Sequence, residues 1–305
     1  MPTASIRTRS PRIVQSRQNA RVKELRAGFA HSSGTDHGHI AIEGEHLLLE
    51  ATATGLHIVA VFVRTGNEHL LERLTLPGDT EILALPPDVF TSAVLTESPQ
   101  GIAALVDPPS FTLDHIFAAP AIPLVLIAAG LQDPGNLGTL IRSAEAFGAT
   151  GLITLPGTVS PWNQKALRAS TGSIFRLPVV AARPITAGSE DEIFPALESR
   201  GIVTLAAVAT DEDPLTRYDL TRPTALILGN EGAGISTEIL RRATARITIP
   251  TPGPVESLNA AIAGSILLYE ASRQRAITPG ANTPGAPRLD SETWDSNTKG
   301  EKGKS

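Results

Sequence analysis

Cysteine is absent from this sequence of 305 residues, histidine is confined to its first 115 residues, and Trp and Tyr are scarce throughout. The lack of cysteine excludes disulfides, thiolate metal sites, iron–sulfur clusters and a cysteine nucleophile. All seven histidines precede residue 116, so the later part of the chain has no histidine base or histidine metal site of its own. With only two Trp and two Tyr, base recognition by extensive stacking is not expected.

Positive charge is also in deficit, with 26 Lys+Arg against 31 Asp+Glu and a net charge of −5. Because phosphate contacts come from Lys and Arg, this total argues at face value against nucleic-acid binding. Residues 1–26, however, hold seven basic side chains and one acid, so this segment carries +6 and the remaining 279 residues carry −11. A basic arm on an acidic body indicates either an anionic partner or a solvated terminus.

Long apolar runs are missing as well. The best candidate for a membrane span, which starts at Phe117, is interrupted by two prolines and is shorter than the ~20 apolar residues required. The basic amino terminus is not followed by the apolar core of a signal peptide. We therefore expect a cytoplasmic protein without a membrane partner, and the 41% hydrophobic residues are enough for a core.

The apolar patterning predicts two α/β domains. The predicted boundaries are 1–107 for a small α/β domain, 108–120 for a proline-rich irregular linker, 121–276 for a second α/β domain, and 277–305 for a disordered tail. In the second domain, strands are predicted at 124–130, 151–155, 202–208, 224–229 and 245–250, and helices at 137–148, 162–170, 190–200, 236–243 and 258–275. Near-continuous apolar strands that alternate with helices indicate a parallel sheet covered on both faces. Helix caps are predicted at Asn19, Asn136, Ser160 and Ser236.

Three loops after strands are candidates for a site, because ligands of open parallel sheets bind beyond the carboxyl ends of the strands. They are residues 130–148, 226–236 and 247–259. Each loop also has a purely structural interpretation. Arg142 is compatible with a surface ion pair to Glu145, the glycines around Glu231 with a tight turn, and Ser257 with a helix cap.

The three loops resemble, in order, the motifs of the SpoU (TrmH-like) family of RNA 2′-O-ribose methyltransferases in the SPOUT superfamily. The matching patterns are N-L-G-x-x-x-R at 136–142, L-G-x-E-x-x-G at 228–234 and I-P-x-x-G-x-x-x-S-L-N at 249–259. The stretch ALRASTGSIFRLPV at 166–179 is similar to a further family segment. Including SRQNARVKEL and AIEGEHLLLEATATG, which look like a ribosomal-protein-like RNA-binding domain, the resemblance extends from about residue 12 to 276.

The resemblance implies S-adenosylmethionine (SAM) as methyl donor, no metal, a deep trefoil knot at the carboxyl end of the catalytic domain, and a homodimer that packs through the knots. By matching positions, the cofactor would contact Leu228, Gly229, Glu231, Ile249, Ser257 and Leu258. The predicted catalytic residues are Asn136, Arg142, Glu231 and Asn259. The predicted RNA-binding residues are Arg17, Arg21, Lys23 and Arg142.

The residue inventory limits the chemistry at that site. Without Cys or His, only Arg142, Glu231 or water could accept the proton of a ribose hydroxyl. A guanidinium holds its proton too tightly to act as a base, so we expect Arg142 to orient the hydroxyl and a nearby phosphate. Large-subunit rRNA is the favoured substrate. A tRNA methyltransferase, a non-catalytic RNA-binding or ribosome-assembly factor, and a small-molecule enzyme with a Rossmann-like pocket remain alternatives.

Overall fold

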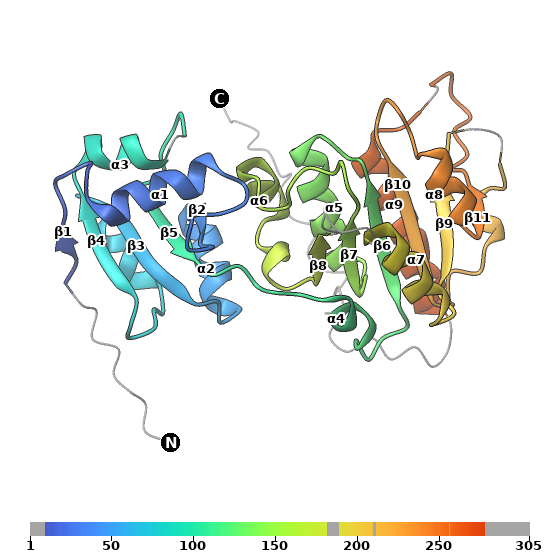
Figure 1. Cartoon of the computed structure of the whole chain (residues 1–305), viewed down its shortest axis with the longest axis horizontal. Helices are drawn as coiled ribbons and strands as arrows, with labels where there is room; N and C mark the ends of the chain where they lie inside the picture. Colours follow the sequence, from blue (N-terminus) through green and yellow to red (C-terminus); the bar gives the residue numbers. More distant parts are fainter. Residues whose placement is uncertain (1–9, 95, 182–188, 210–211, 256, 278–305) are drawn as a thin grey trace, which may run out of the picture.

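The computed structural model describes residues 10–94, 96–181, 189–209, 212–255 and 257–277. Figure 1 shows two α/β units side by side along the long axis, each built on its own sheet. Most of the predicted tail lies outside the described residues, and Ile277, its first residue, is the last residue of a helix. No described helix is long and apolar enough to cross a membrane.

The first unit contains a five-stranded mixed sheet in the order β1-β4-β3-β5-β2. Strand β5 runs antiparallel to both β2 and β3, while β1 and β3 pair with β4 in parallel. Its elements are β1 (Arg12–Ile13), α1 (Ala20–Ala30), β2 (Ile40–Glu43), α2 (Glu45–Ala53), β3 (Ile58–Arg64), the 3₁₀ helix η1 (Glu68–Arg73), β4 (Glu81–Leu85), α3 (Pro87–Val94) and β5 (Ile102–Val106). The edge strand β1 lies within the basic arm, for which the sequence predicted no strand.

The second unit contains a six-stranded sheet in the order β11-β9-β10-β6-β7-β8, and every pairing in it is parallel. Its elements are α4 (Leu113–Phe117), β6 (Leu124–Ala129), α5 (Pro134–Ala146), β7 (Gly151–Thr154), α6 (Gln164–Ser170), η2 (Ser173–Phe175), β8 (Val179–Ala181), α7 (Ser189–Glu198), β9 (Val203–Ala207), η3 (Leu215–Arg217), β10 (Thr224–Gly229), α8 (Thr237–Arg242), β11 (Ala245–Ile247) and α9 (Ala260–Ile277). The predicted parallel sheet is confirmed.

Alternation along the central strands explains why both faces of this sheet are covered. In β6, Leu124 and Leu126 belong to the hydrophobic cluster that includes residues of α5 and α9, whereas Val125 and Ile127 belong to the cluster that includes residues of α4, α7 and α8. Successive side chains of a strand point to opposite faces, so a strand covered twice must be apolar throughout. The run LVLIAA of β6 meets this requirement with six buried residues.

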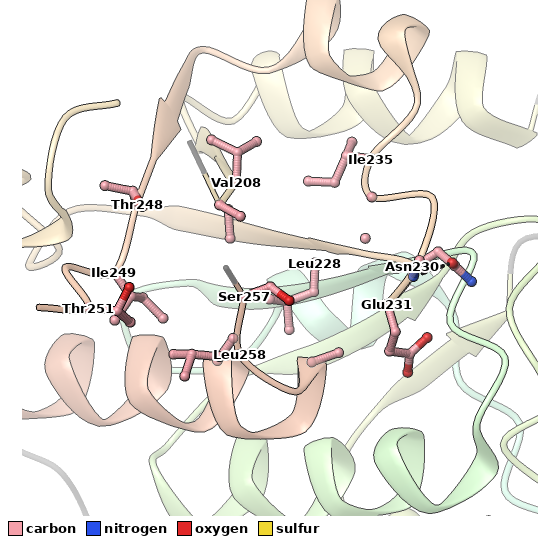
Figure 2. Close-up of a pocket in the computed structure, with 17 residues that line it drawn as sticks. Val208, Leu228, Asn230, Glu231, Ile235, Thr248, Ile249, Thr251, Ser257 and Leu258 are labelled. Atoms are coloured by element: carbon pink, nitrogen blue, oxygen red, sulfur yellow. Dashed lines mark hydrogen bonds between the residues drawn. The ribbon is translucent and has the colours of Figure 1, made fainter. Parts of the chain in front are cut away.

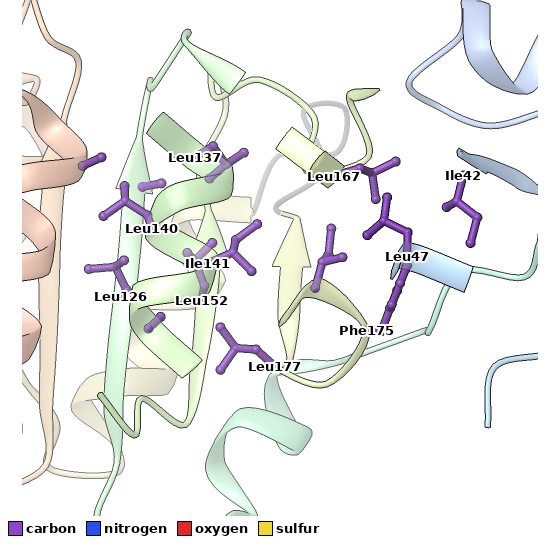
Figure 3. Close-up of a cluster of buried hydrophobic side chains, with 14 of the residues drawn as sticks. Ile42, Leu47, Leu126, Leu137, Leu140, Ile141, Leu152, Leu167, Phe175 and Leu177 are labelled. Carbon is purple, nitrogen blue, oxygen red and sulfur yellow. The ribbon is translucent and has the colours of Figure 1, made fainter. Parts of the chain in front are cut away.

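The two units share one hydrophobic cluster. Ile42 and Leu47 of the first unit and Leu167 and Phe175 of the second belong to it, and Figure 3 shows these side chains facing each other across the junction. The amide of Gln164 adds a hydrogen bond of 2.9 Å to the carbonyl of Ala41. The first unit is therefore fixed against α6 and η2 by direct packing.

The predicted irregular linker contains the short helix α4. Ile116 is fully buried in it, and Gly151 of β7 leaves room for this side chain, since an added Cβ there would lie 2.6 Å from Ile116 Cγ1. The prediction of an irregular segment was wrong here because five residues are too few to show a helical period. Residues 113–117 instead cover part of one face of the second sheet.

Two predicted helix caps were displaced by neighbouring residues. Asn19 and Ser236 cap α1 and α8 as expected. Asn136 is not a cap, because α5 begins at Pro134 and the carboxylate of Asp133 accepts from the Asn136 N–H at 2.9 Å. Ser160 is not one either, because Asn163 caps α6. Helix α5 therefore begins earlier than predicted and α6 begins later. Because Asn136 lies inside α5 and does not cap it, its side chain is free for other contacts.

Candidate active site

A pocket of about 390 Å³ lies beyond the carboxyl ends of β9, β10 and β11 and is closed by the segment that leads into α9 (Figure 2). Its volume is within the range of small-molecule sites, roughly 300–1,000 Å³. The lining residues are Ala207, Val208, Ala209, Leu228, Gly229, Asn230, Glu231, Gly232, Gly234, Ile235, Thr248, Ile249, Thr251, Ser257, Leu258, Ala260 and Ala263. All six predicted cofactor residues are among them.

Other lining residues were missed by the sequence analysis. Val208 follows β9, and Thr248 follows β11. Both strands had been predicted, and their carboxyl ends had to lie at the same edge of the sheet as that of β10. The rule that ligands bind beyond the carboxyl ends of parallel strands could therefore have pointed to Val208 and Thr248. The sequence does not show, however, that β9 lies between β10 and β11 in the sheet.

Asn230 holds the glycine-rich loop after β10 in shape. Its backbone exchanges two hydrogen bonds with Gly234, at 3.0 and 2.9 Å. Its side-chain oxygen accepts from the N–H groups of Gly232 and Ala233, and its amide donates 2.9 Å to the carbonyl of Gly130. The loop is thus a defined wall of the pocket, tied to the residue that follows β6, and Asn230 is a further lining residue that the sequence analysis did not single out.

Ser257 lines the pocket and does not cap α9. The helix begins at Ala260, and the side-chain oxygen of Asn259 accepts from the N–H groups of Ala261 and Ile262 at 2.9 and 3.2 Å. The structural interpretation of Ser257 was therefore wrong. Its exposed hydroxyl remains available to a ligand.

Three of the four predicted catalytic side chains meet at the mouth of the pocket. The amide nitrogen of Asn136 donates 2.6 Å to a carboxylate oxygen of Glu231, and the amide nitrogen of Asn259 donates 3.1 Å to the Asn136 oxygen. These residues come from α5, from the loop after β10, and from the residue before α9. The resulting chain of polar groups is solvent-exposed, and Glu231 also lines the pocket.

Arg142 does not join this group. It lies six residues after Asn136 on α5, which places it about 120° around the helix at 3.6 residues per turn. Its side chain is exposed and has no hydrogen bond or ion pair with any described residue. The predicted alternative, a pair with Glu145, is wrong, because Glu145 binds Arg176.

Of the five described basic residues of the arm, Arg12, Arg17 and Arg21 form ion pairs. Arg17 lies 2.8 Å from Asp88 and lowers the pKa of that carboxyl. Arg21 pairs with both Glu81 and Glu24, at 2.6 and 2.8 Å. Of the predicted RNA-binding residues in the arm, Lys23 alone is exposed without a partner among the described residues. The formal +6 of residues 1–26 therefore overstates the local positive potential.

Taken together, the geometry is that of a small-molecule pocket at the carboxyl edge of a parallel sheet, with a polar cluster at its mouth that could position a second substrate. Within the described parts of the chain, no three His, Cys, Asp or Glu side chains are arranged to hold a metal. The polar side chains at the mouth of the pocket are two amides and one carboxylate.

Comparison with known proteins identifies the class. The SpoU rRNA Methylase family matches residues 123–269. The chain is 33% identical over 275 residues to an uncharacterised tRNA/rRNA methyltransferase of Synechocystis sp., with 88% of this chain and 96% of that protein aligned. It is 33% identical over 260 residues to the 23S rRNA (guanosine(2553)-2′-O)-methyltransferase RlmP of Bacillus subtilis, covering 84% of this chain and 97% of RlmP.

A solved structure agrees over both units. The SpoU methyltransferase AviRb from Streptomyces viridochromogenes, in complex with the cofactor AdoMet (SAM), superposes with a TM-score of 0.73 at 31% identity. The superposition covers 85% of this chain and 99% of AviRb. The protein belongs to the SpoU rRNA methylase family.

Proposed function

We propose that this protein is a SAM-dependent methyltransferase that methylates the ribose 2′-hydroxyl of a nucleotide in large-subunit rRNA. The observation that carries the proposal is the position of Glu231, which both lines the pocket and accepts a hydrogen bond from Asn136. A donor in the pocket and a hydroxyl at the polar cluster would therefore be adjacent. An enzyme that modifies ribosomal RNA acts where ribosomes are made, and we place it in the cytoplasm.

The pocket residues fit SAM. Leu228, Ile249 and Leu258 offer apolar surface for an adenine ring, and the Ser257 hydroxyl and the backbone of the glycine-rich loop offer hydrogen bonds. When bound, SAM supplies a methyl group on a sulfonium, and its in-line displacement needs no metal. The glycines matter because an added Cβ on Gly229 would lie 2.4 Å from the carbonyl carbon of Gly234.

The polar cluster would orient the nucleophile. Asn136, Glu231 and Asn259 hold one another through two hydrogen bonds, so their free lone pairs and N–H groups have fixed directions toward a ribose. Glu231 or water is the proton acceptor open to this site. Arg142 would stabilise the developing oxyanion and a neighbouring phosphate by charge.

We further propose that the segments after β10 and β11 form a trefoil knot, and that residues 1–107 form the domain that binds RNA. The loop after β10 and the residues Thr248, Ile249, Thr251, Ser257 and Leu258 line one pocket, and this convergence supports the knot. The covered surface between α2 and α6 supports a fixed, rather than tethered, position of the RNA-binding domain.

A homodimer is proposed from an apolar stripe on α9. Ile262, Ile266 and Tyr269 are 54%, 37% and 55% exposed and follow one another at helical spacing. They surround the same surface hollow as Asn136 and Asn259. A second copy packed on this stripe would cover apolar surface and bring its Arg142 toward a polar cluster that the chain's own Arg142 does not reach.

Ile262→Glu is expected to yield a monomer with little methyltransferase activity, because the new carboxylate would be buried against apolar surface. Size-exclusion chromatography with light scattering measures the mass. Ile13→Glu, at an exposed isoleucine of β1, is the matched control and should leave the mass unchanged. A wild-type protein that is monomeric at micromolar concentration would contradict the proposed dimer.

The RNA backbone has two candidate contacts in the second unit. Among the arginines described between residues 121 and 277, Arg142 and Arg168 alone have neither a carboxylate nor a carbonyl partner; the others are Arg176, Arg200, Arg217, Arg222, Arg241, Arg242, Arg246, Arg273 and Arg275. Both lie on packed neighbours, α5 and α6.

Arg168→Ala is accordingly expected to weaken RNA binding and to reduce the slope of log K against log salt by roughly 0.7–0.9, the loss of one phosphate contact. Fluorescence anisotropy with an rRNA fragment over a salt series measures the slope. Arg241→Ala is the control, since Arg241 is paired with Glu238 at 2.5 Å. Equal slopes for the two variants would exclude a phosphate contact by Arg168.

The function itself is tested by transfer of labelled methyl groups from SAM to total rRNA and tRNA, followed by mapping of the methylated ribose. Label in one nucleotide of 23S-type rRNA supports the proposal, and label only in tRNA would move the enzyme to the second candidate substrate. A rise in melting temperature with SAM but no transfer to either RNA would favour a non-catalytic factor.

A further inference from the structure

Arg142 and Glu145 are three residues apart on α5, a spacing at which an arginine and a glutamate usually attract each other. In the structure Glu145 is occupied by another cation. Nε and Nη2 of Arg176 donate to its two carboxylate oxygens at 2.5 and 3.0 Å. Arg142 is left without a partner among the described residues because Glu145, the acid three residues along the same helix, is already paired with Arg176.

Arg176 also connects the two units. Its Nη1 donates to the carboxylate of Glu50 on α2. The backbone around this contact is tightly fitted: an added Cβ on Gly172 would lie 2.6 Å from Glu50 Cγ, and Thr171 has a φ of 48°, which is unusual for a β-branched residue. The guanidinium therefore lies between one carboxylate of each unit, at the junction and beside α5.

The carboxylate of Glu145 carries its charge at neutral pH. Burial by itself would raise its pKa, but the hydrogen bonds from Arg176 and Ser173 outweigh burial and hold the pKa below its ordinary value. Its side chain is 30% exposed and that of Glu50 26% exposed. Without Arg176, these two partly buried carboxylates would have no cationic partner among the described residues, and Arg142 is an unpaired cation on the same helix as Glu145.

We propose that Arg176 is a positioning residue for methyl transfer: by binding Glu145 it keeps Arg142 unpaired and available to RNA, and by binding Glu50 it makes this dependent on the docked first unit. The inference rests on the proposed function, in which Arg142 contacts RNA. A purely structural role for Arg176, in holding the two units together, is the competing explanation.

The two explanations differ in how Glu145→Gln acts on a variant without Arg176. Arg176→Gln is expected to lower kcat/KM for rRNA methylation about three- to tenfold, because an unpartnered carboxylate captures Arg142. Glu145→Gln alone should stay within about twofold of wild type. The double variant Arg176→Gln/Glu145→Gln should recover to within about twofold, since no Glu145 charge remains to bind Arg142.

A structural role predicts the opposite, because removing Glu145 does not restore a contact between the units. A double variant as impaired as Arg176→Gln would overturn the proposal. If Arg176→Gln fails to fold, judged by melting temperature and SAM binding, Arg176→Lys keeps a cation beside Glu145, so its kcat/KM is expected to stay within about twofold of wild type. A loss in Arg176→Lys that Glu145→Gln does not reverse would overturn the proposal.

Binding provides a readout that does not depend on catalysis. The salt slope of rRNA binding should fall by roughly 0.7–0.9 in Arg176→Gln and return in the double variant. Absence of methyl transfer by the wild-type protein would contradict the proposed function alone, and the salt slopes would still decide whether Arg176 keeps Arg142 free. Unchanged slopes in Arg176→Gln would overturn the inference.

Discussion

Arg142→Ala is expected to lower the rate of methyl transfer by about 10²–10³-fold, the effect typical of removing one preorganised group that stabilises developing charge. SAM affinity should stay within about twofold, because Arg142 does not line the pocket. Single-turnover transfer from labelled SAM to rRNA measures the rate, and calorimetric titration with SAM measures the affinity. Arg222→Ala, an exposed arginine beside Asp219, is the control for nonspecific loss of charge.

Arg142→Lys separates the shape of the guanidinium from its charge. A planar guanidinium can bind a hydroxyl and a phosphate at once, whereas an ammonium acts as a point charge. We therefore expect Arg142→Lys to remain at least tenfold below wild type. Turnover near the wild-type value would show that charge alone suffices and would contradict an orienting role for Arg142.

The second large effect is expected at the glycine-rich loop. Gly229→Ala should abolish measurable SAM binding, or weaken it at least 30-fold, in a protein that remains folded. An added Cβ would lie 2.4 and 2.6 Å from the carbonyl carbon and oxygen of Gly234. Gly234 would have to move away, and the two backbone hydrogen bonds between Asn230 and Gly234 would be lost. Calorimetric titration and the SAM-induced shift in melting temperature both measure the loss.

Gly232→Ala is the matched control. Gly232 lines the same pocket, and an added Cβ there meets only the side-chain oxygen of Asn230, at 3.6 Å, an ordinary contact distance. It should bind SAM within about threefold of wild type. Equal affinities for Gly229→Ala and Gly232→Ala would mean that the close approach of Gly229 to Gly234 does not define the cofactor pocket.

The charge distribution illustrates how far a sequence count can mislead. The amino-terminal arm holds seven basic residues, yet Arg12 and Arg21 bind Glu81, and Arg17 binds Asp88. These acids are 60 or more residues away in the chain, so no local count could include them. Arg168, in contrast, was not singled out within the stretch 166–179, and it forms no ion pair with any described residue.

The sequence by itself determined the parallel sheet and the two motifs that supply part of the pocket lining. Strands such as LVLIAA are apolar on both faces, and the motifs at 228–234 and 249–259 lie directly after strands, so their meeting at one edge of the sheet followed from topology alone. Helix starts were less certain, because Asp133 and Asn163 compete as caps with Asn136 and Ser160 only a few residues away.

Only the tertiary structure decided which polar groups are joined and which are left free. Asn136 reaches Glu231 across 95 residues and Asn259 across 123, at distances set by how α5 packs against α9 and β6 against β10. Arg142 was part of the same motif as Asn136, yet helix geometry turns it to another face, and Arg176 removes its local partner Glu145. Hydrogen bonds and ion pairs depend on ångström-scale separations, which sequence spacing does not specify beyond a few helical turns.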